Sequence, residues 1–256
     1  MSVRSRTDRQ IAVVVYPGVS GLELVGTTSV LNGLGLKTGF RTTTVAQARQ
    51  AVTAYPRVRL VSEATFDAAP QPFGLVVPGG TGLEAITAMA DKGLLDYVSS
   101  AARTARLVGA VGTGSLILAA AGLLKGRRAT THWAYRRILE NLGATYVDQR
   151  WVEDGPFITS GGSSGGIDMA LHLVAKNTGV AAARHAQLWV EYDPQPPFGG
   201  INPTDRDGSE LAALLTQRRP EWQTRLNERR DLLAAVDAAV VDMPETADEG
   251  VTHGRI

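Results

Sequence analysis

The sequence of 256 residues contains no cysteine. This absence excludes disulfide bonds, thiolate metal ligands and catalysis by a cysteine nucleophile. A strong charge of either sign is also lacking, because the formal net charge is +1 and only 20% of the residues are charged. The charge balance therefore gives no support to a nucleic acid or an acidic surface as partner.

Long apolar runs are absent as well. No stretch reaches the roughly 18–20 apolar residues that a membrane-spanning helix needs. The polar residues 1–10 lead into a strand-like run and not into the apolar core of a signal peptide. We expect a cytoplasmic protein with no membrane partner. The histidines show no metal-ligand spacing, so we also expect no metal and no cofactor, and a small-molecule substrate as the partner.

Short apolar segments alternate with helical patterns along most of the chain. Strands are expected at 11–16, 41–46, 58–61, 74–77, 107–111, 146–152 and 157–160, and helices at 21–36, 91–105, 134–142 and 167–178. This alternation predicts an α/β fold with a doubly wound, mostly parallel sheet. In such a sheet the loops after Tyr16, Val77, Val111 and Ser160 converge on one crevice at the carboxyl ends of the strands.

The pattern changes after Asp193-Pro-Gln-Pro-Pro-Phe-Gly-Gly200. Two helical patterns, 209–218 and 222–241, are separated by Pro220, and the last residues are polar. We expect an α/β domain at 9–203, a C-terminal helical extension at 204–243 and a disordered tail at 244–256.

The segment 107–124 is the most informative part of the chain. It predicts a buried strand, a sharp turn at Gly112 and a helix that opens at Thr113. In α/β enzymes this layout holds a nucleophile above the sheet on a strained backbone. Gly112 has no side chain with which to attack, and we expect it to leave space above the sheet.

Glu23, in Gly21-Leu-Glu-Leu-Val-Gly26, follows the first strand. Burial between leucines near the crevice would raise its pKa, which suits a general acid or base. A solvated glutamate at a helix N-terminus, favoured by the helix dipole, is the alternative interpretation.

Three other segments carry candidate site residues. Pro78-Gly-Gly-Thr-Gly82 leaves a strand and enters a helix, so its amides form either an oxyanion or phosphate nest or a plain glycine turn. Gly161-Gly-Ser-Ser-Gly165 matches G-x-S-x-G, which makes Ser163 a formal hydrolase nucleophile if an acid and a histidine follow. His132, in Thr130-Thr-His-Trp133, is either a proton shuttle or a buried, hydrogen-bonded imidazole.

Together these pieces resemble the isonitrile hydratase branch of the ThiJ/PfpI superfamily, within the class I glutamine amidotransferase-like, flavodoxin-like fold. The resemblance runs from about 9 to 203. It rests on the segments 22–26, 77–82, 112–124, 126–134, 161–168 and 191–198. Similar modules form the ligand-sensing half of some AraC-type regulators, but their DNA-binding half is not recognisable here.

The resemblance implies roles for several residues. A cysteine that attacks the substrate corresponds to Gly112, and an acid that handles protons corresponds to Glu23, where the hydratases carry aspartate. The amides of Gly79, Gly80 and Thr113 are expected on the oxyanion side. The remaining pocket residues are expected to be Ser163, Ser164 and His132, with the serine loop closing the pocket. The resemblance also implies a homodimer.

From the residues and the resemblance we expect a cysteine-independent enzyme in which Glu23 gives general acid/base catalysis on a small organic substrate. Suitable reactions are dehydration, proton transfer next to a carbonyl or imine, and amine–aldehyde condensation with ring closure (Pictet–Spengler type). This is a lyase or cyclase step of small-molecule biosynthesis. Two alternatives remain open: a non-catalytic small-molecule sensor, and an isonitrile hydratase inactivated at its nucleophile.

Overall fold

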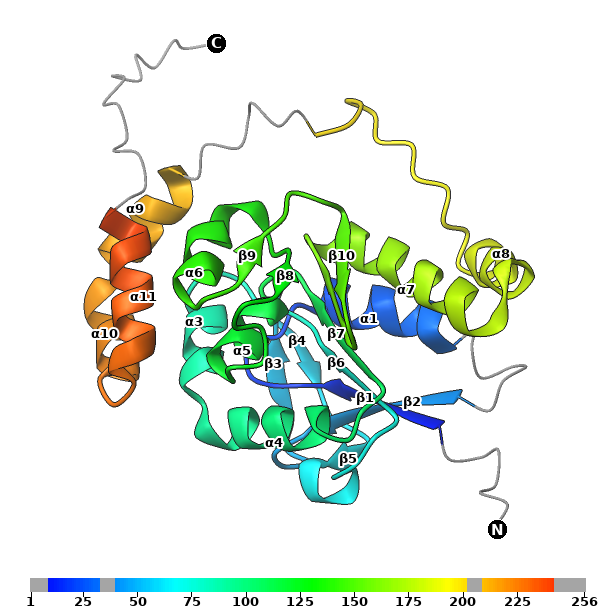
Figure 1. Ribbon diagram of the computed structural model, residues 1–256, viewed down its shortest axis with the longest axis horizontal. Helices are drawn as coiled ribbons and strands as arrows, with labels where there is room; N and C mark the ends of the chain where they lie inside the picture. The colour runs from blue at the N-terminus through cyan, green and yellow to red at the C-terminus, as the bar shows by residue number, and fades with distance from the viewer. Residues whose placement is uncertain (1–8, 33–39, 202–208, 242–256) are drawn as a thin grey trace.

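A mostly parallel sheet between two layers of helices forms the centre of the protein (Figure 1). The computed structural model describes residues 9–32, 40–201 and 209–241. Within these residues the sheet has seven strands in the order β10-β11-β7-β6-β1-β2-β5. Their bounds are β1 Arg9–Val14, β2 Phe40–Ala46, β5 Ala64–Thr65, β6 Gly74–Val77, β7 Leu107–Val111, β10 Trp151–Asp154 and β11 Phe157–Ser160. Neighbouring strands are parallel except β10 and β11, which confirms the predicted fold class.

The helices cover both faces of this sheet. Helices α1 (Gly21–Asn32) and α7 (Ser163–Thr178) pack against each other on one face, with α8 (Val180–Trp189) beside α7. The other face carries α3 (Leu83–Ala90), α4 (Lys92–Ala102) and α5 (Gly114–Ala120), with α6 (Arg136–Asn141) beside α5 (Figure 1). Because both faces are covered, the central strands are apolar without alternation.

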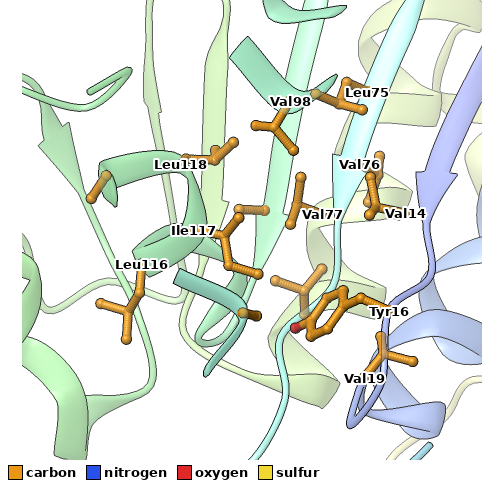
Figure 2. Close-up of a cluster of buried hydrophobic side chains, with 14 of the residues drawn as sticks. Val14, Tyr16, Val19, Leu75, Val76, Val77, Val98, Leu116, Ile117 and Leu118 are labelled. Atoms are coloured by element: carbon orange, nitrogen blue, oxygen red, sulfur yellow. The ribbon is translucent and has the colours of Figure 1, made fainter. Parts of the chain in front are cut away.

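The core forms where these layers meet. Every residue of β6 and of α5 is buried. Figure 2 shows side chains of β6 and α5 in one cluster with Tyr16 and Val19, which follow β1. The cluster packs the ends of β1 and β6 against α5, and the loops that follow these strands carry the site described below.

The turn between β7 and α5 has the predicted strand–turn–helix layout. Gly112 has a φ of +52°, a left-handed conformation that glycine adopts without strain. The helix begins at Gly114, one residue later than expected, with Thr113 as its N-cap. A Cβ on Gly114 would lie 2.0 Å from the carbonyl oxygen of Val77, so the close approach of α5 to β6 requires glycine there.

Three sequence predictions need correction. The expected strand 146–152 is two strands, because a turn at 147–149 separates β9 (Thr145–Tyr146), which pairs with β8 (Arg128–Ala129), from β10. The expected strand 58–61 is β4 (Val58–Leu60), which pairs with β3 (Val52–Ala54) in a hairpin outside the central sheet.

The third correction concerns the C-terminal helices. The predicted break near Pro220 falls at Arg218, between α9 (Ser209–Gln217) and α10 (Arg219–Leu226), and Pro220 lies in the first turn of α10, where no intrahelical N–H is needed. The sequence analysis did not predict the second break, at 227–229, which divides the expected helix 222–241 into α10 and α11 (Arg230–Val241). The sequence gives no sign of the short strands β3 and β5, whereas α3 follows the glycine segment 78–82 as expected. Two 3₁₀ turns, η1 (Phe66–Ala68) and η2 (Trp133–Tyr135), complete the described elements.

The C-terminal helices pack against the α/β core. Helix α10 contacts α3 and α11 contacts α6, and α9 (Ser209–Gln217) contacts α11 (Figure 1). Trp222 is fully buried and donates its indole N–H to the carbonyl of Leu215 at 2.8 Å. The expected boundary at 203–204 and the expected tail at 244–256 lie outside the described residues. In the parts of the chain that the structure describes, no helix has the length and apolar character needed to cross a membrane.

Candidate active site

Glu23 lies in the first turn of α1, but its carboxylate points into the protein. The backbone N–H of Glu23 donates to Ser20 Oγ at 3.4 Å, which places Ser20 at the start of the helix. The carboxylate accepts a hydrogen bond of 2.6 Å, to Oε2, from the N–H of Gly79 in the loop after β6. Glu23 is only 7% exposed, so the solvated interpretation is wrong.

Burial dominates the protonation equilibrium of this carboxyl group. Removal from water disfavours the charged form and raises the pKa of Glu23 to about 7. Hydrogen bonds from the Gly79 N–H and the Ser163 side chain stabilise the carboxylate and offset part of this rise. Near neutral pH, Glu23 is therefore present both as an acid and as a base.

Gly112 lies directly against the Glu23 carboxylate. A Cβ on Gly112 would be 2.6 Å from Glu23 Oε1, well inside van der Waals contact. The expected empty space above Gly112 is therefore not there, because the carboxylate of Glu23 fills it. A side chain on Gly112 would point into the space that the Glu23 carboxylate, from helix α1, now occupies.

The glycine loop after β6 holds this carboxylate and is itself held by Thr113. The Gly80 N–H donates to Thr113 Oγ1 at 2.9 Å, and the same hydroxyl donates to the Gly80 carbonyl at 2.6 Å. A Cβ on Gly79 would lie 2.5 Å from Thr113 Oγ1, so this packing requires glycine. The amides of Gly79 and Gly80, expected to face an oxyanion, already have partners within the protein.

Two buried tyrosine hydroxyls fix the ends of the same loop. Tyr16 donates to the carbonyl of Pro78 at 2.9 Å, and Tyr135 accepts from the N–H of Gly82 at 2.7 Å. Burial raises the pKa of Tyr135 to about 12, so its hydroxyl stays protonated. The sequence alone does not single out Tyr135, and it leaves the role of Tyr16 open. No local signal identifies either, because both partners are distant in sequence.

A cavity of about 500 Å³ adjoins this cluster. His132, Ser163 and Ser164 all line it, as the sequence analysis expected of pocket residues. Two hydroxyls connect the cavity to the elbow: Thr131 Oγ1 donates to the Gly112 carbonyl at 3.1 Å, and Ser163 hydrogen-bonds to Glu23. The structure thus brings the expected site residues into two adjoining groups, the buried cluster at Glu23 and the cavity wall.

The contacts described for His132 and His172 are not those of a serine-hydrolase triad. His172 Nε2 lies 3.3 Å from Glu153, on the same helix as Ser163 but more than two turns further along. His132 accepts the Ala134 N–H at Nδ1 (3.4 Å) and packs beside the Trp133 ring. His253 lies outside the described residues. Ser163 hydrogen-bonds to the carboxyl group of Glu23, whereas the nucleophile of a triad hydrogen-bonds to a histidine.

The fold and site define a doubly wound α/β protein with a buried carboxyl group at the carboxyl ends of its central strands. Comparison with known sequences adds the family. The chain belongs to the DJ-1/PfpI family, which it matches over residues 9–176.

The relatives include an enzyme, a regulator and a solved structure. An isonitrile hydratase of Pseudomonas putida is 42% identical over 222 residues, which is 86% of this chain and 95% of the hydratase. The HTH-type transcriptional regulator CdhR of Pseudomonas aeruginosa is 38% identical over 130 residues, 50% of this chain and 36% of the regulator. The crystal structure of a ThiJ/PfpI family protein from Pseudomonas syringae is 32% identical with a TM-score of 0.75, covering 91% of this chain and 90% of that one.

Proposed function

We propose that this chain is an enzyme that works without a cysteine, by acid/base chemistry of Glu23 on a small organic substrate. The observation that carries the proposal is the buried Glu23 carboxyl group, whose pKa of about 7 keeps both protonation states available near neutral pH. General acid/base catalysis of this kind contributes about 10²–10⁴-fold, and its efficiency is highest when the pKa is near the working pH.

The glycine at the elbow supports this choice of chemistry. Hydration of an isonitrile through a covalent intermediate needs a thiolate, and the chain has no cysteine. The oxygen atoms of Glu23 lie where a side chain on Gly112 would be. The scaffold of the family thus presents a proton donor and acceptor at its elbow instead of a nucleophile.

The reaction class we propose is condensation of an amine with an aldehyde, followed by ring closure onto an aromatic carbon. Loss of water to form the iminium ion needs a proton donor, and loss of the ring proton after closure needs a base. One carboxyl group that cycles between its two forms supplies both steps and ends in its starting state. The adjoining cavity of about 500 Å³ has the size of a small-molecule site.

The test uses tryptamine and acetaldehyde with the purified protein at pH 7, and chiral chromatography of the cyclised product. The uncatalysed reaction gives a racemate, so an enantiomeric excess reports the enzyme. We expect an excess with the wild type and only the racemic background with Glu23→Gln. A wild type that gives only background rejects this reaction class, and a Glu23→Gln variant that keeps the excess rejects the role of Glu23.

A sensor is the second candidate, favoured by the similarity to part of the regulator CdhR. A sensor binds its ligand without turnover. It predicts a ligand-induced rise in Tm with no change of the ligand in mass spectrometry, whether residue 23 is Glu or Gln.

We also propose a homodimer, formed through the outer side of α1 and the neighbouring hairpin. Leu22, Val25 and Tyr55 are each more than half exposed, and the Gly21 N–H donates to the Tyr55 carbonyl, which places them near one another. Burial against a second copy would remove this apolar surface from water. Sedimentation should give a dimer for the wild type and a monomer for Val25→Glu; a monomeric wild type contradicts the proposal.

A further inference from the structure

The Glu23 carboxyl group and the cavity are neighbours that share one residue, Ser163. Among the described residues Glu23 is not part of the cavity lining, and it is only 7% exposed. Ser163 belongs to both: it lines the cavity, and its side chain hydrogen-bonds to Glu23. Its position follows from the fold, because it is the first residue of α7, after the strand β11 that adjoins the elbow strand β7.

The cavity also contains a polar group without a partner. Thr130 is 1% exposed and lines the cavity, and within the described structure its Oγ1 has no hydrogen-bond partner. A buried hydroxyl that makes no hydrogen bond is costly, so such a group indicates a site that a ligand or water completes. This hydroxyl is therefore a second polar group, besides Ser163, in the wall of the cavity.

From this arrangement we propose that the Ser163 hydroxyl is the proton relay between a substrate in the cavity and the carboxyl group of Glu23, an inference that rests on the proposed function. In the forward step the substrate transfers a proton to Ser163 Oγ while the hydroxyl proton of Ser163 moves to the Glu23 carboxylate. The substrate loses one proton, Glu23 gains one, and the serine is unchanged. The reverse step delivers the proton back to the substrate.

The relay assigns different roles to two adjacent serines. Ser164 also lines the cavity, but it is exposed, and the interactions that shift the pKa of Glu23 include Ser163 and not Ser164. Removal of the Ser163 hydroxyl is therefore expected to interrupt proton access to Glu23, whereas removal of the Ser164 hydroxyl is not. Thr131 is engaged with the Gly112 carbonyl and offers no such path.

A measurement on the protein without any substrate tests the relay. A laser-induced pH jump with a caged proton, followed by time-resolved infrared spectroscopy, records protonation of Glu23 through its carboxyl C=O band, which is identified by its loss in Glu23→Gln. We expect Ser163→Ala to slow this protonation by about 10²-fold or more, the range that a positioned proton-transfer group contributes. Ser163→Thr keeps a hydroxyl and should restore the rate, and Ser164→Ala should protonate Glu23 as fast as the wild type.

Equilibrium titration of the same band gives a second readout. Because the Ser163 hydrogen bond stabilises the carboxylate, Ser163→Ala should raise the titration midpoint of Glu23 above the wild-type value, and Ser164→Ala should leave it in place. Unchanged protonation kinetics in Ser163→Ala overturn the relay, whatever the turnover assays show. If Glu23→Gln keeps turnover, the proposed function is wrong. The relay is then still tested separately, by the pH-jump kinetics of Ser163→Ala.

Discussion

The carboxylate of Glu23 and the backbone of Gly112 occupy adjoining positions, so a side chain at residue 112 requires the carboxylate to shift. Oε1 of Glu23 lies 2.6 Å from the place of a Cβ at Gly112, and Oε2 is tied to the Gly79 N–H at 2.6 Å. The carboxylate cannot move aside without losing this hydrogen bond. The length of the side chain at 23 and the absence of one at 112 are therefore coupled.

The first prediction tests this coupling by the stability of Gly112→Ala. The added methyl group has to displace the Glu23 carboxylate, and the backbone at φ +52° adds a cost of about 1–2 kcal/mol for a residue with a Cβ. Gly122→Ala is the matched control, because Gly122 has a φ of +77° and open space around its Cβ position. Urea unfolding should show a larger loss for Gly112→Ala than for Gly122→Ala.

Gly112→Ala should lose less stability when it is combined with Glu23→Asp, because the aspartate side chain is one methylene shorter and leaves room for the methyl group. In a double-mutant cycle, we expect a coupling free energy of about 1 kcal/mol or more between positions 23 and 112. Equal losses in Gly112→Ala and Gly122→Ala, or additive effects in the cycle, would show that the carboxylate does not fill this space.

The second prediction concerns stability as a function of pH. The folded protein raises the pKa of Glu23 from 4.5 to about 7, so its contribution to stability is fully present below pH 4.5 and is lost as the pH rises to 7. Over this window the free energy of unfolding of the wild type should fall by about 3 kcal/mol relative to Glu23→Gln. Denaturant titrations of both proteins between pH 4 and pH 8 measure this difference, and a difference that does not vary with pH contradicts it.

Local sequence patterns were sufficient for the elbow but not for the direction of the Glu23 side chain. The apolar run 107–111, followed by glycine and a helix, specifies strand, turn and helix from neighbouring residues alone. Glu23 stands three residues after Ser20, a spacing that also suits a solvent-facing helix cap. The outcome depends on the Gly79 N–H, 56 positions away, which no local pattern reveals.

The same limit explains the other residues that the sequence analysis missed or misplaced. Tyr135 meets Gly82 across 53 positions, and the place of Thr130 in the cavity wall is set by the folded structure and not by a local pattern. In the C-terminal region, apolar residues keep helical spacing on both sides of the break at 227–229. Since this break contains neither glycine nor proline, the sequence gives no sign that α10 and α11 are separate helices.

The third prediction concerns the pH dependence of turnover. If the slow step takes a proton from the substrate, the rate should rise with pH to a plateau, with a midpoint near the Glu23 pKa of about 7. If the slow step donates a proton, the rate should fall through the same midpoint. Initial rates with tryptamine and acetaldehyde from pH 5 to pH 9, corrected for the uncatalysed reaction, give the profile. A profile flat across pH 7 excludes titration of Glu23 in the slow step.

The fourth prediction tests whether Tyr135 positions the glycine loop at 78–82 in addition to stabilising the fold. Tyr135→Phe leaves the buried Gly82 N–H without its acceptor, which costs about 1–3 kcal/mol. Tyr97→Phe is the matched control, because Tyr97 donates a buried hydrogen bond of 3.0 Å to the Ala69 carbonyl. We expect comparable losses in Tm but a shifted infrared band of Glu23 only in Tyr135→Phe. An identical band in both variants would mean that Tyr135 does not position the loop.

The fifth prediction tests whether the chain is a hydratase scaffold that lacks only its nucleophile. A cysteine at 112 supplies a thiolate that can attack the carbon of an isonitrile, and hydrolysis of the resulting thioimidate releases a formamide and regenerates the thiolate. With Glu23 in place the new side chain meets its carboxylate, so Gly112→Cys alone should form little product. The double variant Gly112→Cys/Glu23→Asp makes room for the thiol while it keeps an acid nearby. We therefore expect formamide from cyclohexyl isonitrile with the double variant, and none with Gly112→Ser/Glu23→Asp, in which the hydroxyl is a far weaker nucleophile.

Equal activity of the single and double cysteine variants would refute the steric coupling. An inactive double variant whose thiol reacts normally with iodoacetamide would show that the scaffold differs from the hydratase in more than the nucleophile, which favours the acid/base function of Glu23.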